Sequence, residues 1–396
     1  MAADPSAPRC LLHAFSTFAV GGPQVRFCDV ANALGRDYRH VITAMDEDFA
    51  CASRLHDGVT WDAVPVSAVK SRGISFRNLK RFRKIVATVR PDVMITYNFG
   101  ALEWALANRW WPLAPHLHFE DGFGPDETAK QLRRRVYLRR LVLHGKTRVV
   151  VPSHTLWRMA TERWGLNPKQ VLLIPNGVDC DRFDKTQDRG TLQRYGLGRD
   201  TVVIGTVAAL RPEKNLARLI SAFARLGGNF AAQLVIVGEG PEREKLELLA
   251  KESGVGARVH FTGPVRRPEE LYGCFDIFVM SSDTEQMPIS LIEAMASELP
   301  VVATDVGDIT KIVAPENRFL IEGCRDDDKL ASGMLSLASD PELRQRLGTC
   351  NRSRARAEFG IEKMLRSYKR LFDTASLTEV IRSTGLPDQE RASFHG

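Results

Sequence analysis

Short apolar runs alternate with longer amphipathic segments along almost the whole chain, and this alternation restricts the possible folds more than any other feature. In the first half, the runs that predict strands are 11–15, 40–44, 93–96, 116–119, 148–151 and 171–174. In the second half they are 202–207, 233–237, 258–261, 277–280, 300–303 and 319–321. Helical patterns lie between them. Strands that alternate with helices predict parallel sheets covered by helices on both faces.

Two such series predict two doubly wound, Rossmann-like α/β domains that face a central cleft. The 396 residues are also too many for one hydrophobic core. Pro175-Asn176-Gly177 predicts a turn, and a polar stretch follows at 181–194. We therefore expect a first domain over 1–180, a second over 181–359, and a disordered polar tail over 375–396.

The cellular compartment follows from features that the chain lacks. No window approaches the ~18 consecutive apolar residues that a membrane-spanning helix needs. Residues 1–8 show no charged flank followed by an apolar stretch, so no secretory signal is visible. The seven cysteines are scattered without a Cys-x-x-Cys pair, which favours reduced thiols over a disulfide framework or a zinc site. These features predict a cytoplasmic protein.

Lysines and arginines gather in two segments of the first half that contain no acidic residue, 63–91 and 128–161. The helix expected over 75–90 combines such cations with an apolar stripe, as do helices that lie on anionic membranes. The alternative is that the stripe is the inner face of a Rossmann helix and the charges are solvated. Both interpretations stay open, and peripheral membrane contact is a hypothesis. No nucleic-acid-binding module accompanies the cations, so we expect no nucleic-acid partner.

Two glutamates frame the segment that follows the expected strand 277–280. Pro288 suits the first turn of a helix, which places Glu285 in the loop ahead of that helix and Glu293 about a turn and a half inside it. Carboxylates accept hydrogen bonds from the vicinal hydroxyls of sugars and riboses, and a helix N-terminus attracts phosphate. Both glutamates could be solvated surface charges, but the apolar residues over 289–296 favour a buried helix.

Segment 285–293 resembles the Glu-x7-Glu motif of retaining glycosyltransferases of family four (glycosyl transferases group 1), which have the two-Rossmann-domain GT-B architecture. Further segments resemble other loops of that family in order and spacing, and they are Gly21-Gly22, 174–179, 210–215, 237–241 and 261–263. The resemblance covers most of the chain. It implies that the first domain binds the acceptor, the second binds the donor, and a helix at about 360–374 closes the first domain.

The resemblance also implies the activity, which is transfer of a sugar from a UDP- or GDP-linked donor to a glycan or lipid-linked acceptor. Retention of configuration, independence of metal, and a place in polysaccharide or cell-envelope glycan synthesis are expected with it. Contact with the inner face of the cytoplasmic membrane would suit a lipid-linked acceptor. The oligomeric state stays open. Two alternatives also stay open: a catalytically idle nucleotide-sugar-binding protein, and a nucleotide-sugar epimerase on the same fold.

The resemblance assigns roles to residues of the second domain. Glu285 would hold the transferred sugar, Glu293 the ribose, and Lys214 with Arg211 the diphosphate, where a fixed cation stabilises the leaving group. The other donor-binding residues that it implies are Gly21, Gly22, Asn215, Gly238, Gly240, Gly263, Ile289 and Ser290. The chain departs from the family at Ala209, where an arginine is usual, and at Gln286-Met287-Pro288, where Gly-Phe-Gly is usual.

Family members carry a histidine after a strand of the first domain, near the reacting sugar. His118 is the match, and Asp121 is a competing position. A lone histidine in a strand is more often structural. Asn98, Glu120 and Asp121 are candidates for binding acceptor hydroxyls. No cluster of histidine and acidic residues has metal-ligand spacing, so we expect no metal and no cofactor besides the donor.

Overall fold

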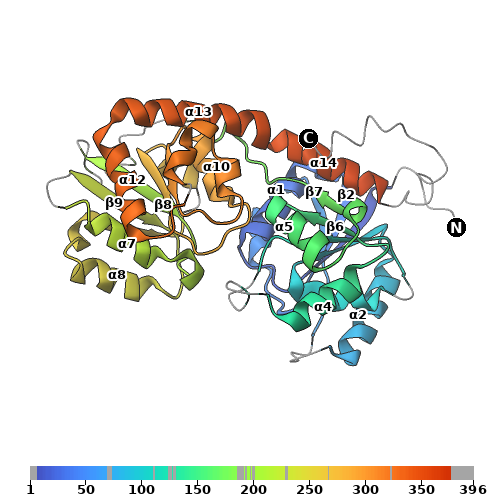
Figure 1. The fold of residues 1–396 in the computed structure, drawn as a ribbon. Helices are drawn as coiled ribbons and strands as arrows, with labels where there is room; N and C mark the ends of the chain where they lie inside the picture. Colours follow the sequence, from blue (N-terminus) through green and yellow to red (C-terminus); the bar gives the residue numbers. More distant parts are fainter. Residues whose placement is uncertain are drawn as a thin grey trace. The chain divides into compact units, whose positions relative to one another are not determined.

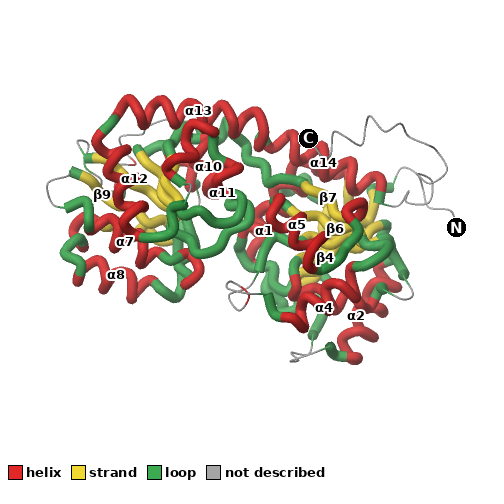
Figure 2. The backbone as a smooth tube through the Cα atoms, viewed as in Figure 1, coloured by secondary structure: helices red, strands yellow, loops and turns green. Residues whose placement is uncertain are grey.

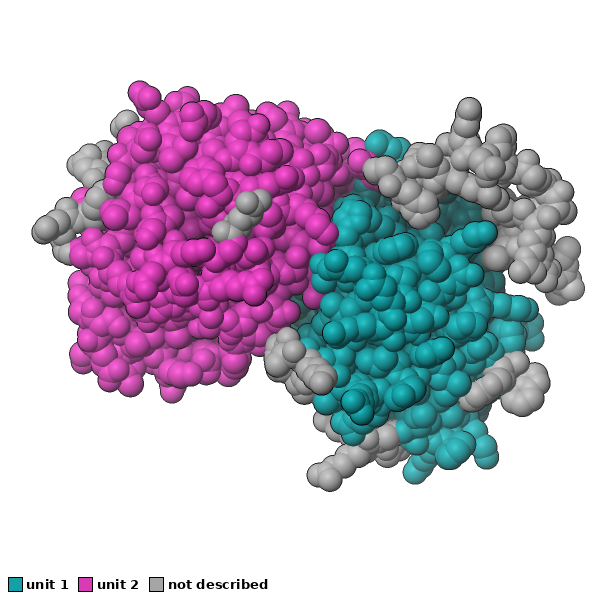
Figure 3. Space-filling model, viewed as in Figure 1, with its two compact units in different colours: residues 1–175, 364–396 teal, residues 176–363 magenta. Residues whose placement is uncertain are grey.

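The computed structural model describes residues 7–375 except 69–73, 110–111, 124–126, 128–130, 185–190, 192–193, 197, 199–200, 228–230, 266 and 322. The tail predicted to be disordered therefore lies outside the described residues from position 376 onward. The chain divides into two compact units, residues 1–175 with 364–396 and residues 176–363 (Figure 3). We call them unit 1 and unit 2. Among the described residues, no helix is long and apolar enough to cross a membrane.

Unit 1 contains a seven-stranded parallel sheet in the order β3-β2-β1-β4-β5-β6-β7 (Figure 1). Its strands are β1 Arg9–Phe15, β2 Tyr38–Ala44, β3 Thr60–Ala63, β4 Val93–Tyr97, β5 His116–Phe119, β6 Arg148–Val151 and β7 Val171–Leu173. Its α-helices are α1 Gly22–Leu34, α2 Phe76–Val89, α3 Leu102–Ala107, α4 Arg133–Leu143 and α5 His154–Arg158. The strand order reverses between β1 and β4, and ligands of such sheets bind where this reversal occurs.

Unit 2 contains a five-stranded parallel sheet in the order β10-β9-β8-β11-β12 (Figure 2). Its strands are β8 Val202–Val207, β9 Ala232–Val237, β10 Val259–Gly263, β11 Ile277–Met280 and β12 Val301–Ala303. Its α-helices are α7 Leu216–Ala224, α8 Arg243–Glu252, α9 Pro268–Tyr272, α10 Ile289–Ala296, α11 Ile309–Ile312, α12 Asp327–Ser339 and α13 Pro341–Phe359. The reversal of strand order falls between β8 and β11, so a ligand of unit 2 is expected at the loops after these strands.

The last helix, α14 (Ile361–Thr374), packs on unit 1 although it follows unit 2 in the sequence. Its buried residues recur on one helical face, and two of them meet aromatic rings of unit 1. Tyr368 stacks on Phe119, and Phe372 meets Tyr38 edge-on. This helix corresponds to the closing helix expected at about 360–374.

The borders of the two units differ by a few residues from the sequence-based borders at 180/181 and 359/360. The backbone of Val178 explains the difference. Its N–H donates to Phe359 O at 2.9 Å, and its carbonyl accepts from the N–H of Ile361 at 3.0 Å. These bonds tie the segment after Pro175 to the end of α13, so it belongs to unit 2.

Eleven of the twelve predicted strands are present within one or two residues of their expected bounds. Segment 319–321 is the exception, because Pro315–Leu320 forms a 3-10 helix. The side chain of Asn317 in that helix forms hydrogen bonds with the backbone of the edge strand β12. It accepts from Val301 N–H at 2.9 Å and donates to Val301 O at 2.6 Å. The side-chain amide thus takes the place of a further strand.

The apolar stripe of α2 is the inner face of the helix, which is the second of the two interpretations given above for the segment 75–90. Phe82 is fully buried and stacks on Trp104 of α3 with ring centroids 4.2 Å apart. Ser75 caps the helix start by accepting from Asn78 N–H. Any membrane contact must therefore use residues outside this stripe.

Candidate functional site

A lysine and a glutamate meet beyond the carboxyl ends of β8 and β11, at the point where the strand order of unit 2 reverses. Lys214 Nζ lies 2.6 Å from Glu285 Oε1, and Ser282 Oγ donates to the same oxygen at 2.7 Å. The side chain of Glu285 is 8% exposed and that of Lys214 24%. The pair is therefore screened from bulk water on most sides but open to a ligand.

The loop that carries Lys214 is fixed to the segment that carries Glu285. Asn215 has a left-handed backbone with φ of 42°, and its side chain accepts from Arg218 N–H, which caps α7. Its amide nitrogen also donates to Asp283 at 3.1 Å. Ser281 Oγ donates to Lys214 O at 3.1 Å. These contacts hold both charged groups before any ligand arrives, as electrostatic stabilisation requires.

The second glutamate of the motif is oriented by a buried tyrosine. Tyr272 Oη lies 2.8 Å from Glu293 Oε2 and 3.1 Å from Ser290 O. Burial, and then the charge of Glu293, raises the pKa of Tyr272 well above its ordinary value, so the hydroxyl stays protonated and can donate. Glu293 lies inside α10, as the sequence predicted, and it is partly exposed.

Helix α10 begins one residue later than its proline suggested. Pro288 is the N-cap and Ile289 is the first helical residue. The N–H groups of the first turn, which include those of Ile289 and Ser290, have no partners within the helix. The preceding backbone is held in place because Asn176 Nδ2 donates to Met287 O at 2.8 Å.

The predicted glycines of unit 2 allow two loops to pack closely. A side chain at Gly238, whose φ is 137°, would place its Cβ 2.0 Å from Ala208 O. At Gly240 the Cβ would lie 2.4 Å from Leu210 O. Gly263, with φ of 73°, accepts from Gly238 N–H at 3.0 Å. These glycines shape the loop that leads to Arg211 and Lys214.

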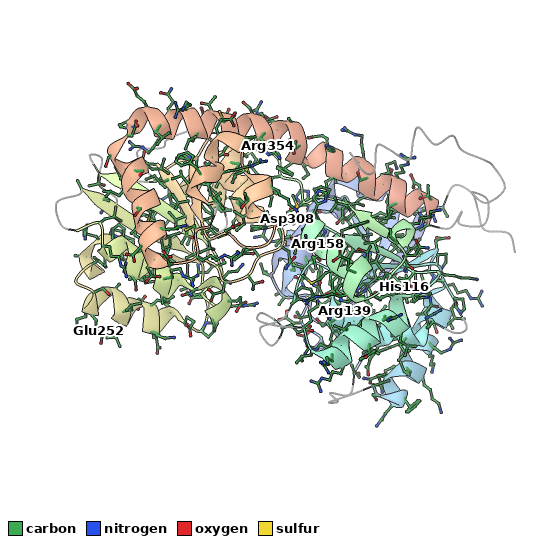
Figure 4. All side chains as sticks on the ribbon, viewed as in Figure 1. His116, Arg139, Arg158, Glu252, Asp308 and Arg354 are labelled. Carbon is green, nitrogen blue, oxygen red and sulfur yellow. The ribbon has the colours of Figure 1, made fainter. Side chains whose placement is uncertain are left out.

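Sequence reasoning missed a supporting loop after β12. Gly307 has φ of 62°, and a Cβ there would lie 2.1 Å from Glu285 O. Asp308, labelled in Figure 4, donates its N–H to Gln286 O at 3.4 Å. Thr304 Oγ1 donates to Ser282 O at 2.6 Å. The signal that could have revealed this loop is a glycine shortly after a strand, near the same sheet edge.

In unit 1, the predicted residues that remain accessible gather after β1, β4 and β5. Gly21 is the N-cap of α1 and Gly22 its first residue. Asn98 has φ of 54°, and its side chain accepts from Asp121 N–H at 2.7 Å. Asp121 forms a two-pronged ion pair with Arg26 of α1, with one contact of 2.8 Å. The side chain of Asp121 is 11% exposed.

Two of the predicted residues of unit 1, His118 and Glu120, are fully buried in the structure. His118 Nδ1 lies 2.8 Å from Thr96 Oγ1, and its Nε2 lies 3.4 Å from Glu120 Oε2. Arg139, which is labelled in Figure 4, donates its Nε–H to that same carboxylate oxygen at 3.0 Å. Burial alone would raise the pKa of Glu120, but the Arg139 guanidinium and His118 hold it below its ordinary value. Both residues belong to a polar core network, and Asp121 remains as the candidate.

Two family models match most of the chain between them. One is described as Glycosyltransferase Family 4 and matches residues 20–182. The other is described as glycosyl transferases group 1 and matches residues 191–354. The border between the two matches falls near the border between the two units.

Each of the similar curated proteins matches only part of this chain. N-acetyl-alpha-D-glucosaminyl L-malate synthase of Bacillus anthracis is 25% identical over 224 residues, 57% of this chain and 58% of that protein. GDP-mannose-dependent alpha-(1-6)-phosphatidylinositol monomannoside mannosyltransferase of Mycobacterium tuberculosis (strain CDC 1551 / Oshkosh) is 32% identical over 223 residues. These residues are 53% of this chain and 57% of that protein. The chain thus spans about half the length of the curated relatives it matches.

Among solved structures, HepE of Anabaena in complex with UDP-glucose is similar over nearly the whole chain. The TM-score is 0.80 at 17% identity, and the match covers 92% of this chain and 99% of HepE. At this identity the likeness concerns the fold.

Proposed function

This chain belongs to the glycosyltransferases of GT-B architecture, with a family 4 region followed by a group 1 region, and on that premise we propose that it transfers a sugar. The donor is a UDP- or GDP-linked sugar, and the acceptor is a glycan or a lipid-linked glycan. Two relatives support this donor class by name, since HepE was solved with UDP-glucose and the mycobacterial enzyme is called GDP-mannose-dependent.

The observation that carries the proposal is the pair of Lys214 and Glu285, 2.6 Å apart at the reversal of strand order. In the proposed reaction the bond between the anomeric carbon and the diphosphate oxygen breaks, and negative charge develops on the leaving diphosphate. Lys214 and Arg211 neutralise that charge, together with the N–H groups at the start of α10. Glu285 binds hydroxyls of the sugar, and Glu293 binds those of the ribose.

Retention of configuration follows if the acceptor hydroxyl attacks the face from which the diphosphate departs. The departing phosphate oxygen is then the nearest base and takes the proton of that hydroxyl. In this proposal the fixed cations and helix amides do the work that a metal does in other transferases. Asn98 and Asp121 of unit 1 are the proposed acceptor contacts, because both are accessible and Arg26 fixes the carboxylate of Asp121.

The outer faces of two basic helices support peripheral membrane contact at the cytoplasmic face. Helices α2 and α4 both pack on α3. They expose large apolar side chains among their arginines and lysines: Phe76 is 81% exposed, Tyr137 70% and Leu141 54%. Aromatic side chains combined with cations favour an anionic lipid surface. A lipid-linked acceptor would be reached from such a surface.

Donor binding and turnover test the proposal. The protein is titrated with UDP-, GDP- and ADP-sugars while its melting temperature and the release of nucleoside diphosphate are followed. We expect one donor class to raise the melting temperature, and we expect Lys214→Ala and Glu285→Gln to abolish the rise. Lys245→Ala is the matched control, because Lys245 is an exposed cation of unit 2 that pairs with Glu242.

Other outcomes point to the alternatives. Interconversion of the donor sugar without an acceptor would indicate an epimerase. Donor binding without release of nucleoside diphosphate, across glycan and lipid-linked acceptors, would indicate a binding protein. Failure of every donor to bind folded protein would contradict the proposed site.

A further inference from the structure

Unit 1 contains a cavity of about 840 Å³ at the amino-terminal ends of its strands. Its lining includes His116 at the start of β5, Arg148 at the start of β6, and Gln170 just before β7. Figure 4 labels His116. Asn98 and Asp121 follow the carboxyl ends of β4 and β5, so the cavity lies at the opposite edge of the sheet. Its volume is within the range of small-molecule sites, roughly 300–1,000 Å³.

The cavity is lined by cations and by no described acidic side chain. Three separate segments supply the four cations, which are Arg109, Lys146, Arg148 and Lys169. Arg148 is the most informative, because it is partly buried and forms no ion pair with any described residue. Burial lowers its pKa, and no acidic neighbour opposes this effect. A guanidinium placed in this way lacks an anion, and the cavity provides room for one.

The walls of the cavity are held in place independently of any ligand. Asn108 donates to Ala114 O at 2.8 Å and accepts from Leu113 N–H at 2.7 Å, which fixes the loop after α3. Gln170 donates to Leu143 O at 2.8 Å and to Thr147 O at 3.0 Å, which fixes the loop after α4. Leu113 supplies an apolar wall and is 43% exposed. The cavity is therefore preformed and has both a cationic and an apolar side.

Helix termini provide a competing explanation for some of the charge. Helices α3 and α4 end at this edge of the sheet, and cations near helix C-termini are stabilising. That explanation suits Arg109 and Lys146, which follow these helices directly. It does not explain Arg148, which lies on a strand, or Lys169, which precedes another strand.

We propose that this cavity is a second ligand site, and that it binds a small phosphorylated organic molecule. Arg148 and Arg109 contact the phosphate oxygens through their planar guanidinium groups, and Lys146 and Lys169 add charge. The organic part lies along Leu113 and the neighbouring prolines. The site is separate from the proposed donor site, and it stands whether or not the transferase proposal holds.

Calorimetry on the full chain tests the site with fructose 1,6-bisphosphate and inorganic phosphate as probes. We expect saturable binding of the sugar bisphosphate, at least tenfold tighter than inorganic phosphate. Arg148→Gln combined with Lys169→Gln should weaken it by tenfold or more. Arg36→Gln combined with Arg163→Gln removes the same charge from exposed positions of unit 1 and should leave it unchanged. Lys146→Glu, at an exposed position, replaces the double variant if that variant does not melt like the parent.

Binding that survives the cavity variants but is lost in Lys214→Ala would place the probe at the donor site and overturn the proposal. Equal affinity for inorganic phosphate, or the same loss in the control pair, would also overturn it.

The location of the site is checked with pyridoxal 5′-phosphate. Its aldehyde condenses with a lysine amine and releases water, and borohydride then reduces the resulting imine. We expect labelled peptides that contain Lys146 or Lys169, protected by the sugar bisphosphate. Labelling that avoids both lysines would contradict the site.

Discussion

The hydroxyl of Tyr272 orients Glu293, because it lies 2.8 Å from one oxygen of that carboxylate. Tyr272→Phe removes this hydrogen bond without changing the shape of the buried ring. A hydrogen bond to a charged group contributes about 1.5–3 kcal/mol, although solvent replaces part of it at a partly exposed carboxylate. We expect the KM for the donor to rise roughly threefold to tenfold with little change in kcat.

Tyr195→Phe is the matched control, because Tyr195 lies in the same unit and is partly buried. Initial-rate kinetics over a range of donor concentrations measure the effect, with melting temperatures to verify folding. A loss of kcat at unchanged KM would show that Glu293 acts on the reacting sugar rather than on the ribose.

A buried histidine pair makes the stability of unit 1 depend on pH. His13 Nε2 lies 3.0 Å from His40 Nδ1, and His40 Nε2 has no partner among the described residues. Burial lowers the pKa of His40 from 6.5 to about 4. Between these values the unfolded chain binds the proton and the folded chain does not. The free energy of unfolding therefore falls as the pH drops from 6.5 to about 4, by about 3 kcal/mol for this residue.

Tryptophan fluorescence can follow this loss in unit 1 alone, because all six tryptophans lie within residues 61–164. Urea unfolding at several pH values should give a shallower pH dependence for His40→Gln than for the parent, even if the variant is less stable throughout. His56→Gln, at an exposed position, should keep the parent's dependence. An unchanged slope in His40→Gln would mean that other groups cause the acid sensitivity.

At the level of elements, the loop after β12 packs closely against the backbone of Glu285, because Gly307 has no side chain. Gly307→Ala would force its Cβ to within 2.1 Å of Glu285 O, so the backbone of Glu285 must shift. Displacement of a binding group by about 1 Å can cost on the order of a hundredfold in rate. We expect kcat/KM for the donor to fall at least tenfold.

Gly254→Ala separates this effect from backbone strain. Gly254 also has a positive φ, 72° against 62° at Gly307, but nothing lies within 4 Å of its Cβ position. Both variants therefore carry a similar conformational cost, and only Gly307→Ala carries the clash. Equal activity of the two variants would show that the loop after β12 does not hold Glu285 in place.

The elements also show what the sequence can and cannot reveal. A strand that is buried on both faces, such as β11, is a continuous apolar run, so its position was predictable. The edge strand β3 is mostly exposed and has no apolar run, so it was missed. Segment 319–321 has an apolar run but lies in no strand of the described residues, because the side chain of Asn317 already forms hydrogen bonds with the backbone of β12.

The same contrast holds at the candidate site. Lys214 and Glu285 are recognisable because the loops that carry them follow predicted strands and resemble loops of a known family, and chain topology then brings them together. The burial of His118 could not be foreseen. It depends on Arg139, which lies 21 positions later in the sequence and reaches Glu120 only in the folded chain. Long-range pairs between charged side chains leave no local pattern.

At the scale of the whole molecule, the net charge of +7 and the exposed aromatic side chains of α2 and α4 predict binding to anionic vesicles. Because the apolar stripe of α2 is buried, the contact must come from outward residues such as Phe76 and Tyr137. Burial of an aromatic side chain contributes about 1.5–3 kcal/mol, and each cation near the surface about 1 kcal/mol. Phe76→Ala combined with Tyr137→Ala should weaken vesicle binding roughly tenfold or more.

Co-sedimentation with vesicles of anionic and of zwitterionic lipid measures this, each at low and high salt. Leu248→Ala combined with Phe319→Ala is the matched control, because both residues are more than half exposed on unit 2, at 55% and 59%. Binding that depends on charge alone would disappear at high salt yet persist in the Phe76 and Tyr137 variant. Binding that depends on both charge and aromatic side chains would be lost at high salt and also in the Phe76 and Tyr137 variant, and it would be retained in the control. If zwitterionic vesicles bind as well as anionic ones, the cations of α2 and α4 do not contribute to the membrane contact.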